Sequence, residues 1–88
     1  MASYRYVVRG RVQGVGYRYF VVKWAEELGV SGFVRNQPDG SVEVFAEAGD
    51  EVLGSFEGRL RQGPSFSRVE DVERLAISPR GDLGFYIR

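Results

Sequence analysis

The segment from Gly10 to Arg18, GRVQGVGYR, combines three glycines with an arginine and contains no acidic residue. Glycine reaches backbone conformations that other residues avoid, so a glycine-rich turn can direct successive N–H groups at a bound anion. Arginine adds a planar guanidinium that suits phosphate. These residue types therefore indicate phosphate chemistry. Taken alone, a plain turn between a strand and a helix is the commoner explanation, because neither standard phosphate-binding motif is complete.

Asn36 is a second residue that could take part in chemistry, and it is the only asparagine in the chain. The chain contains no histidine, cysteine or threonine. This excludes histidine-assisted nucleophiles, imidazole or thiolate metal ligands, and disulfides. An enzyme with this sequence must work with arginine, asparagine, carboxylates, hydroxyls, backbone groups or the substrate itself. The carboxylates are scattered along the chain, so we expect no metal site and no cofactor.

Hydrophobic periodicity predicts the elements that must position Arg18 and Asn36. Residues 4–12 alternate as a strand does, residues 18–28 show helical spacing, and residues 31–36 read as a second strand. Strand, helix and strand form a right-handed crossover. The helix descends about 16 Å and the second strand climbs back about 20 Å. We therefore expect Arg18 and Asn36 to return to the same edge of the sheet.

The remaining sequence predicts a hairpin, a second helix and two further strands. The irregular spacing of Val69, Val72 and Leu75 suggests a bulge in the first of these strands. The predicted order is β-α-β-β-α-β, an α+β ferredoxin-like sandwich with two helices on one face of an antiparallel sheet and the other face in solvent. We expect one domain, residues 1–88. The later elements are a turn at 37–41, a strand from 42, a helix capped by Asp50 and ending at Gly63, and strands at 68–78 and 83–87.

Charge and hydropathy limit the partners of this chain. Twelve basic and twelve acidic residues give a formal net charge of zero, which argues against non-specific nucleic-acid binding. No apolar run is long enough to cross a bilayer, and an arginine interrupts the N-terminal segment where a signal peptide is apolar. We therefore expect a protein of the cytoplasm that contacts neither membrane nor nucleic acid. We also expect it to be a monomer.

Two segments carry a resemblance to a known family. Residues 10–18, GRVQGVGYR, resemble the first motif of the acylphosphatases, and residues 32–42, GFVRNQPDGSV, resemble the second. Glycine and proline at 63–64 and the C-terminal FYIR are similar to later parts of the family pattern, so the resemblance covers essentially the whole chain. Two positions depart from the pattern. Tyr17 stands where the family usually has phenylalanine or methionine, and Ala48 where a glycine is usual.

The resemblance implies hydrolysis of the carboxyl–phosphate bond of small acyl phosphates, giving a carboxylate and inorganic phosphate. It also implies that Arg18 binds the phosphoryl group together with backbone N–H groups, and that Asn36 holds the attacking water. A loose phosphoryl-transfer transition state needs mainly positioning and charge stabilisation, which agrees with the lack of a side-chain nucleophile. The implied phosphate-binding residues are Gln13, Gly14, Val15, Gly16, Tyr17 and Arg18.

Two other functions remain open at this point. Ferredoxin-like sheets also form RNA-binding modules, but the aromatic run at 16–22, GYRYFVV, begins a helix here rather than lying on an exposed strand. The chain could alternatively be a regulatory domain that binds phosphate without catalysis, although Arg18 and Asn36 are both present. Turnover of benzoyl phosphate distinguishes these functions from an enzyme.

Overall fold

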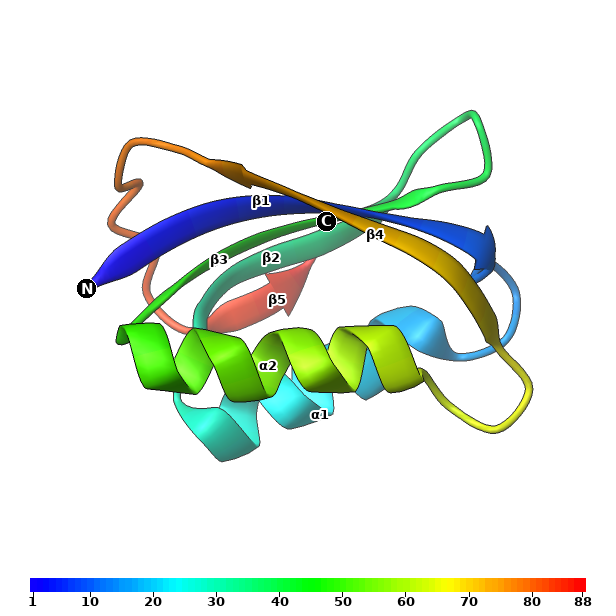
Figure 1. Cartoon of the computed structure of the whole chain (residues 1–88), viewed down its shortest axis with the longest axis horizontal. Coiled ribbons are helices and arrows are strands. Elements are labelled where there is room, and N and C mark those ends of the chain that lie inside the picture. Colours follow the sequence, from blue (N-terminus) through cyan, green and yellow to red (C-terminus); the bar gives the residue numbers. More distant parts are fainter.

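Figure 1 shows the computed structural model of the chain, which describes residues 1–88. The strands form one sheet in the order β4-β1-β3-β2-β5. Both helices lie on the same face of this sheet, as the sequence predicts. The elements are β1 (Ala2–Arg11), α1 (Tyr17–Leu28), β2 (Ser31–Asn36), β3 (Val42–Ala48), α2 (Asp50–Gln62), β4 (Arg68–Ala76) and β5 (Phe85–Ile87).

The short strand β5 departs from the antiparallel sheet that the sequence predicts. The four longer strands pair antiparallel, whereas β5 pairs parallel with β2, with Phe33 opposite Tyr86. The chain leaves β4 at the end of the sheet where β2 begins, and it then crosses to the far side of β2. From there β5 can only run in the direction of β2. The sheet is therefore mixed, with one parallel pair at its edge.

The hydrophobic core lies between the sheet and the two helices. Alternate residues of β1 point into it, and Tyr6 and Val8 are fully buried. The ring of Tyr6 meets Phe56 of α2 edge-on, with centroids 6.3 Å apart, and Val21 of α1 is buried in the same cluster. Each such side chain contributes about 1.5–3 kcal/mol on burial. One core thus explains both the alternating apolar residues of the first strand and the helical spacing of apolar residues that follows it.

A β-bulge interrupts the pairing of β1 with β4, as the irregular sequence of β4 suggests. The register shifts between Arg9 and Gly10, and Glu70 is the extra residue on β4. Gly10 has a φ of 126°, and a Cβ there would lie 2.1 Å from the carbonyl oxygen of Arg68. No side chain fits in that space. Gly10 is therefore required by the close approach of β4, and only the later two glycines of the segment belong to the loop before α1.

The start of α2 corrects one prediction. Gly49, not Asp50, is the N-cap: its backbone is extended, and no side chain caps the helix. Asp50 is instead the first helical residue, where its charge favours the positive end of the helix dipole. Burial of Leu53, Phe56 and Leu60 against the sheet holds this helix in place.

The outer face of the sheet, predicted to be in solvent, is partly covered. Phe33 is only 1% exposed and stacks on Phe45 with ring centroids 4.6 Å apart. The guanidinium of Arg80 lies 5.0 Å from the centre of the Phe33 ring. The segment between β4 and β5 therefore crosses this face and shields two aromatic side chains from water.

Glu47 of β3 anchors the crossing segment. Its carboxylate is 5% exposed and accepts a hydrogen bond from the Ser3 hydroxyl at 2.8 Å. It also accepts the backbone N–H groups of Arg80 and Gly81 at 3.0 and 2.8 Å. These donors, Ser3 first among them, stabilise the ionised carboxylate and hold the pKa of Glu47 below its ordinary value. The charge of Glu47 is thus part of what fixes the segment before β5.

We predict a corresponding loss of stability in acid. Because the folded-state pKa of Glu47 is lowered, its contribution is present above the ordinary glutamate value of about 4.3 and is lost as the pH falls through the folded-state pKa. Glu47→Gln should be less stable at neutral pH and should lose less unfolding free energy than the parent protein between about pH 5 and pH 3. Urea unfolding at each pH measures this. An identical pH dependence in both proteins would contradict the anchoring role.

Candidate active site

The loop between β1 and α1 contains two glycines in the left-handed region. Gly14 and Gly16 have φ values of 74° and 80°, whereas Val15 between them has a negative φ. Such alternation turns successive N–H groups toward one side of the chain and forms a concave nest for an anion. A Cβ at either glycine would meet nothing within 4 Å. Backbone conformation, rather than space, therefore requires glycine at these two positions.

The start of α1 adds further free donors to this loop. Gly16 is the N-cap and has no side chain to accept a hydrogen bond, and the first turn contains no acidic residue. The first helical hydrogen bond runs from the N–H of Phe20 to the carbonyl of Gly16. The preceding N–H groups have no helical acceptor and lie at the positive end of the helix dipole. The loop and the helix start therefore present backbone donors to a negative group.

Gln13 fixes this loop against the turn between β2 and β3. Its side-chain amide donates to the carbonyl oxygens of Gln37 and Ser41 at 2.8 and 2.9 Å. These two bonds use both N–H groups of the amide. Gln13 can therefore offer an anion only its backbone N–H. Since Gln37 directly follows Asn36, the same contacts hold the end of β2 beside the loop.

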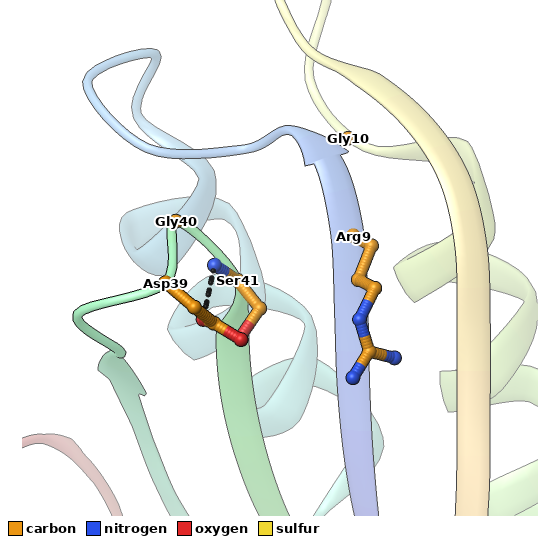
Figure 2. A pocket seen from close by; sticks show the side chains of 5 residues that line it. All are labelled: Arg9, Gly10, Asp39, Gly40 and Ser41. Carbon is orange, nitrogen blue, oxygen red and sulfur yellow. Dashed lines mark hydrogen bonds between the residues drawn. The ribbon is translucent and has the colours of Figure 1, made fainter.

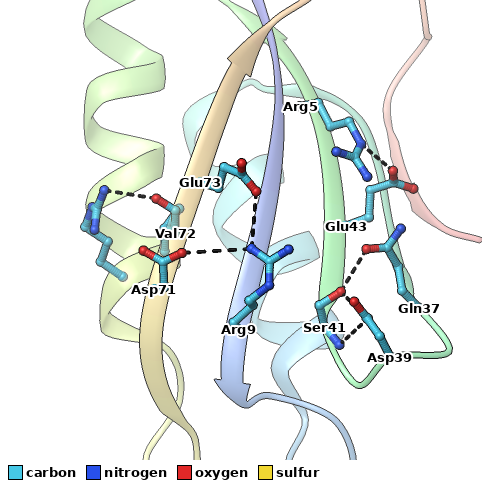
Figure 3. A network of polar contacts seen from close by, with 10 residues as sticks. Arg5, Arg9, Gln37, Asp39, Ser41, Glu43, Asp71, Val72 and Glu73 are labelled. Atoms are coloured by element: carbon cyan, nitrogen blue, oxygen red, sulfur yellow. Dashed lines mark hydrogen bonds and ion pairs between the residues drawn. The ribbon is translucent and has the colours of Figure 1, made fainter.

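The β2–β3 turn is itself held by a local network, drawn in Figure 3. The backbone N–H of Ser41 donates to Asp39 at 2.9 Å, and the Ser41 hydroxyl lies 2.6 Å from the same carboxylate. These contacts, the hydroxyl first, hold the pKa of Asp39 below its usual value. A backbone hydrogen bond from Gln37 to Ser41 closes the turn at 2.9 Å. Asn36 therefore projects from the base of a well-ordered hairpin.

The structure places Arg18 and Asn36 at the same end of the sheet. Arg18 is the second residue of α1, which starts at this end, and Asn36 is the last residue of β2, which finishes there (Figure 1). Arg18 is partly buried but forms no ion pair and no side-chain hydrogen bond. Asn36 pairs with Val42 through the backbone, and its exposed side chain makes no hydrogen bond. Both functional groups are thus free to contact a ligand.

Tyr17 joins the start of α1 to the end of α2. Its buried hydroxyl donates to the carbonyl oxygen of Leu60 at 2.8 Å. That carbonyl belongs to the last turn of α2, where no helical N–H is left to bond it. Burial raises the pKa of the Tyr17 hydroxyl, which therefore remains a donor at neutral pH. The hydroxyl that distinguishes Tyr17 from the usual phenylalanine or methionine thus has a specific acceptor.

Two tyrosine-to-phenylalanine substitutions should have different effects on stability. Tyr17→Phe leaves the buried Leu60 carbonyl without a partner and should cost about 1–3 kcal/mol of unfolding free energy. The hydroxyl of Tyr6 is also buried but has no hydrogen-bond partner. Tyr6→Phe should therefore be neutral or stabilising, because it removes an unsatisfied polar group. Urea unfolding of the two variants measures the difference; equal losses would contradict it.

Neither cavity of the molecule is lined by Arg18 or Asn36. A polar pocket of about 170 Å³ opens between the end of β1 and the β2–β3 turn, as Figure 2 shows. It is lined by Arg9, Gly10, Asp39, Gly40 and Ser41. A second cavity of about 450 Å³ lies between the C-terminal end of α1 and the start of β5. The candidate site is therefore an open surface of backbone donors and a guanidinium, which suits a small anion better than a bulky apolar ligand.

The residues at this site can position a ligand and stabilise negative charge on it. No group of three or more histidine, cysteine, aspartate or glutamate side chains converges to form a ligand set for a metal. What converges at the β1–α1 loop is a set of N–H donors with one arginine and one asparagine beside it.

Neither helix has the length and apolar character needed to span a bilayer.

Comparisons with known proteins agree over the whole chain. Residues 4–87 match the acylphosphatase family model. An acylphosphatase of Thermus thermophilus is 52% identical over 81 residues, which cover 92% of each chain. One of Bacillus subtilis is 46% identical over 72 residues, covering 82% of this chain and 79% of the relative. The crystal structure of acylphosphatase from Bacillus subtilis aligns with a TM-score of 0.97 at 42% identity and covers 100% of this chain and 99% of its own.

Proposed function

Because this chain belongs to the acylphosphatase family, we propose that Arg18 and the backbone N–H groups of residues 13–17 bind the phosphoryl group, and that Asn36 holds the attacking water. The enzyme is an acylphosphatase, which hydrolyses acyl phosphates to a carboxylate and inorganic phosphate. One observation carries the residue assignments. A partly buried guanidinium without an ion pair or hydrogen bond stands at the start of α1, next to a loop whose two left-handed glycines allow its N–H groups to face an anion.

Phosphate binding follows from fixed donors. The guanidinium of Arg18 can engage two of the three terminal phosphoryl oxygens, and the N–H groups around Gly14 and Gly16 can engage the third. In a loose transition state the negative charge spreads over these equatorial oxygens. Donors that the fold holds in place before the substrate binds need no reorganisation as the charge develops. This arrangement lowers the barrier without a covalent intermediate on the protein.

Water attack completes the reaction. Asn36 presents an amide oxygen that can accept a hydrogen bond from water and an amide nitrogen that can donate one. The water oxygen bonds to phosphorus as the bond from phosphorus to the acyl oxygen breaks, and the bonding pair leaves with the carboxylate. The proton of the water passes to a phosphoryl oxygen, giving dihydrogen phosphate. A carboxylate is a stable leaving group, so no side-chain acid is needed.

Turnover of benzoyl phosphate by the purified protein tests this function directly. We expect hydrolysis with release of benzoate and phosphate, and we expect full activity in the presence of EDTA because no residue set on the chain is suited to a metal. Phosphate binding without turnover would favour the regulatory alternative. RNA binding without turnover would favour the other alternative, against which the zero net charge argues.

Inorganic phosphate, as product, should stabilise the folded enzyme through the same cradle. A ligand at ten times its Kd adds about 1.4 kcal/mol, which corresponds to a rise in Tm of roughly 5–10 °C for so small a domain. Arg18→Ala is the matched control, because general salt effects act on both proteins alike. We expect the phosphate-dependent rise mainly in the parent protein. Equal rises in both would mean that the glycine loop is only a turn.

Oligomeric state and location remain predictions of the sequence. We expect the enzyme to act on small acyl phosphates as a monomer in the cytoplasm, without contact to nucleic acid. Size-exclusion chromatography with light scattering tests the monomer, and it should give a mass near the 9.9 kDa of one chain.

A further inference from the structure

Most of the arginines in this protein have a partner within the molecule. Figure 3 shows two examples on the outer face of the sheet, where Arg5 pairs with Glu43 and Arg9 with Glu73. Arg59 and Arg88 have no ion pair, but their guanidinium groups lie over aromatic rings at 3.7 and 4.5 Å. Besides Arg5 and Arg9, the ion-paired arginines are Arg35, Arg61, Arg74 and Arg80.

Three arginines have neither an ion pair nor a hydrogen bond nor an aromatic contact: Arg11, Arg18 and Arg68. All three lie at the end of the sheet that carries the glycine loop (Figure 1). Arg18 already has a proposed ligand in the phosphoryl group. The chain is neutral overall, so this gathering of unpaired positive charge at one end needs a separate explanation for Arg11 and Arg68.

Arg11 and Arg68 form the last residue pair of the β1–β4 ladder, directly opposite each other. Both are exposed. Like charges at directly opposed positions destabilise a sheet, and no neighbouring acid relieves the repulsion. Glu70, the nearest acid on β4, forms no ion pair with either arginine. An anion from outside the protein would relieve the repulsion and could accept a bidentate contact from a guanidinium.

The distance between this arginine pair and the loop limits the length of a molecule that could contact both. Gly14 follows Arg11 by three residues, so their Cα atoms lie no more than about 11 Å apart. A molecule with its phosphoryl group in the loop and a short chain attached could place a second charged group at the arginine pair. An acyl phosphate of a short dicarboxylic acid has this form.

We propose that Arg11 and Arg68 form a second anion subsite, which selects acyl phosphates whose acyl chain ends in a carboxylate. The inference rests on the proposed binding of the phosphoryl group by the loop and Arg18. The subsite contacts a part of the substrate that does not react. It contributes binding that is equal in the ground state and the transition state, so its loss should raise KM and leave kcat nearly unchanged.

Two five-carbon substrates isolate this contribution. Glutaryl phosphate and pentanoyl phosphate have the same chain length, and only the first ends in a carboxylate. We expect Arg68→Gln and Arg11→Gln each to lower kcat/KM for glutaryl phosphate about tenfold, through KM, while kcat/KM for pentanoyl phosphate changes less than about twofold. Arg74→Gln, at the other end of β4, removes the same charge and should alter neither substrate.

The outcomes separate this subsite from simple electrostatic attraction and from the proposed function. If the arginines only attract anions to the protein, Arg68→Gln should also clearly lower kcat/KM for the pentanoyl phosphate dianion, although less than for the more highly charged glutaryl phosphate, and that result would overturn the subsite. Equal use of the two substrates by the parent enzyme would overturn it as well. Turnover of pentanoyl phosphate by the parent enzyme tests the proposed function separately. Failure to hydrolyse either substrate would overturn both.

Discussion

Arg18→Ala should lower kcat/KM for benzoyl phosphate by about 10³-fold or more, the largest effect expected of any single substitution in this enzyme. The guanidinium is the only charged group proposed to contact the phosphoryl oxygens, on which negative charge spreads in the transition state. Arg18 forms no ion pair or hydrogen bond within the protein. Its removal therefore breaks no internal ion pair or hydrogen bond, and urea unfolding should give nearly the stability of the parent protein.

Two further variants separate charge from geometry at this position. Arg18→Lys keeps the charge but loses the planar fork, so it should recover only a small part of the lost activity. Lys23→Ala, further along the same helix, removes one positive charge from an exposed position and should leave kcat/KM nearly unchanged. Activity near that of the parent enzyme in Arg18→Ala would refute the assignment. Equal losses in Arg18→Ala and Lys23→Ala would indicate an effect of overall charge alone.

The sequence predicts the secondary structure well where burial imposes a period. The second strand has the predicted bounds, 31–36, and the first helix begins at Tyr17, one residue before the predicted start. Both elements place alternate or helically spaced apolar residues in one core, so local pattern and tertiary packing favour the same structure. The placement of Arg18 and Asn36 at the same end of the sheet also follows from chain geometry, because a right-handed strand–helix–strand crossover fixes where the helix starts and where the second strand ends.

Contacts between distant residues could not be predicted in this way. Gln13 reads as an ordinary loop residue, and nothing in its neighbourhood indicates that its amide bonds to Gln37 and Ser41. Likewise, Glu47 looks like an outward-facing strand residue until the segment before β5 folds over it. The period of a strand predicts which face a side chain takes, but not whether another segment covers that face. The cover arises from the direction in which the chain leaves β4.

The prediction that Asp50 caps α2 was wrong for a local reason. Asp50 is a favoured N-cap residue by type, but a helix can equally begin one residue earlier with glycine as its cap. Gly49 adopts the extended backbone of an N-cap, and Asp50 gains from the helix dipole as the first helical residue. The two possible helix starts are one residue apart, and their free energies differ by less than about 1 kcal/mol. The N-cap preferences of the residue types alone do not distinguish them.

Asn36→Ala should reduce kcat by about 10²-fold while leaving the affinity for inorganic phosphate nearly intact. Asn36 is proposed to hold the water and not the phosphoryl group, so its loss misplaces the nucleophile without removing a phosphate contact. The backbone pairing of Asn36 with Val42 does not depend on the side chain, and the hairpin should therefore persist. Steady-state kinetics with phosphate as a competitive inhibitor measure kcat and affinity in the same experiment.

The contrast with Arg18 makes this assignment testable. Phosphate should raise the Tm of Asn36→Ala as it does that of the parent protein, whereas it should raise that of Arg18→Ala much less. Asn36→Asp keeps the shape but places a negative charge beside the phosphoryl group, so it should weaken phosphate binding as well as lower kcat. If Asn36→Ala instead lost phosphate affinity and kept its kcat, the amide would be a substrate contact. The water would then have to be positioned by another group at this end of the sheet, by the backbone or by the substrate.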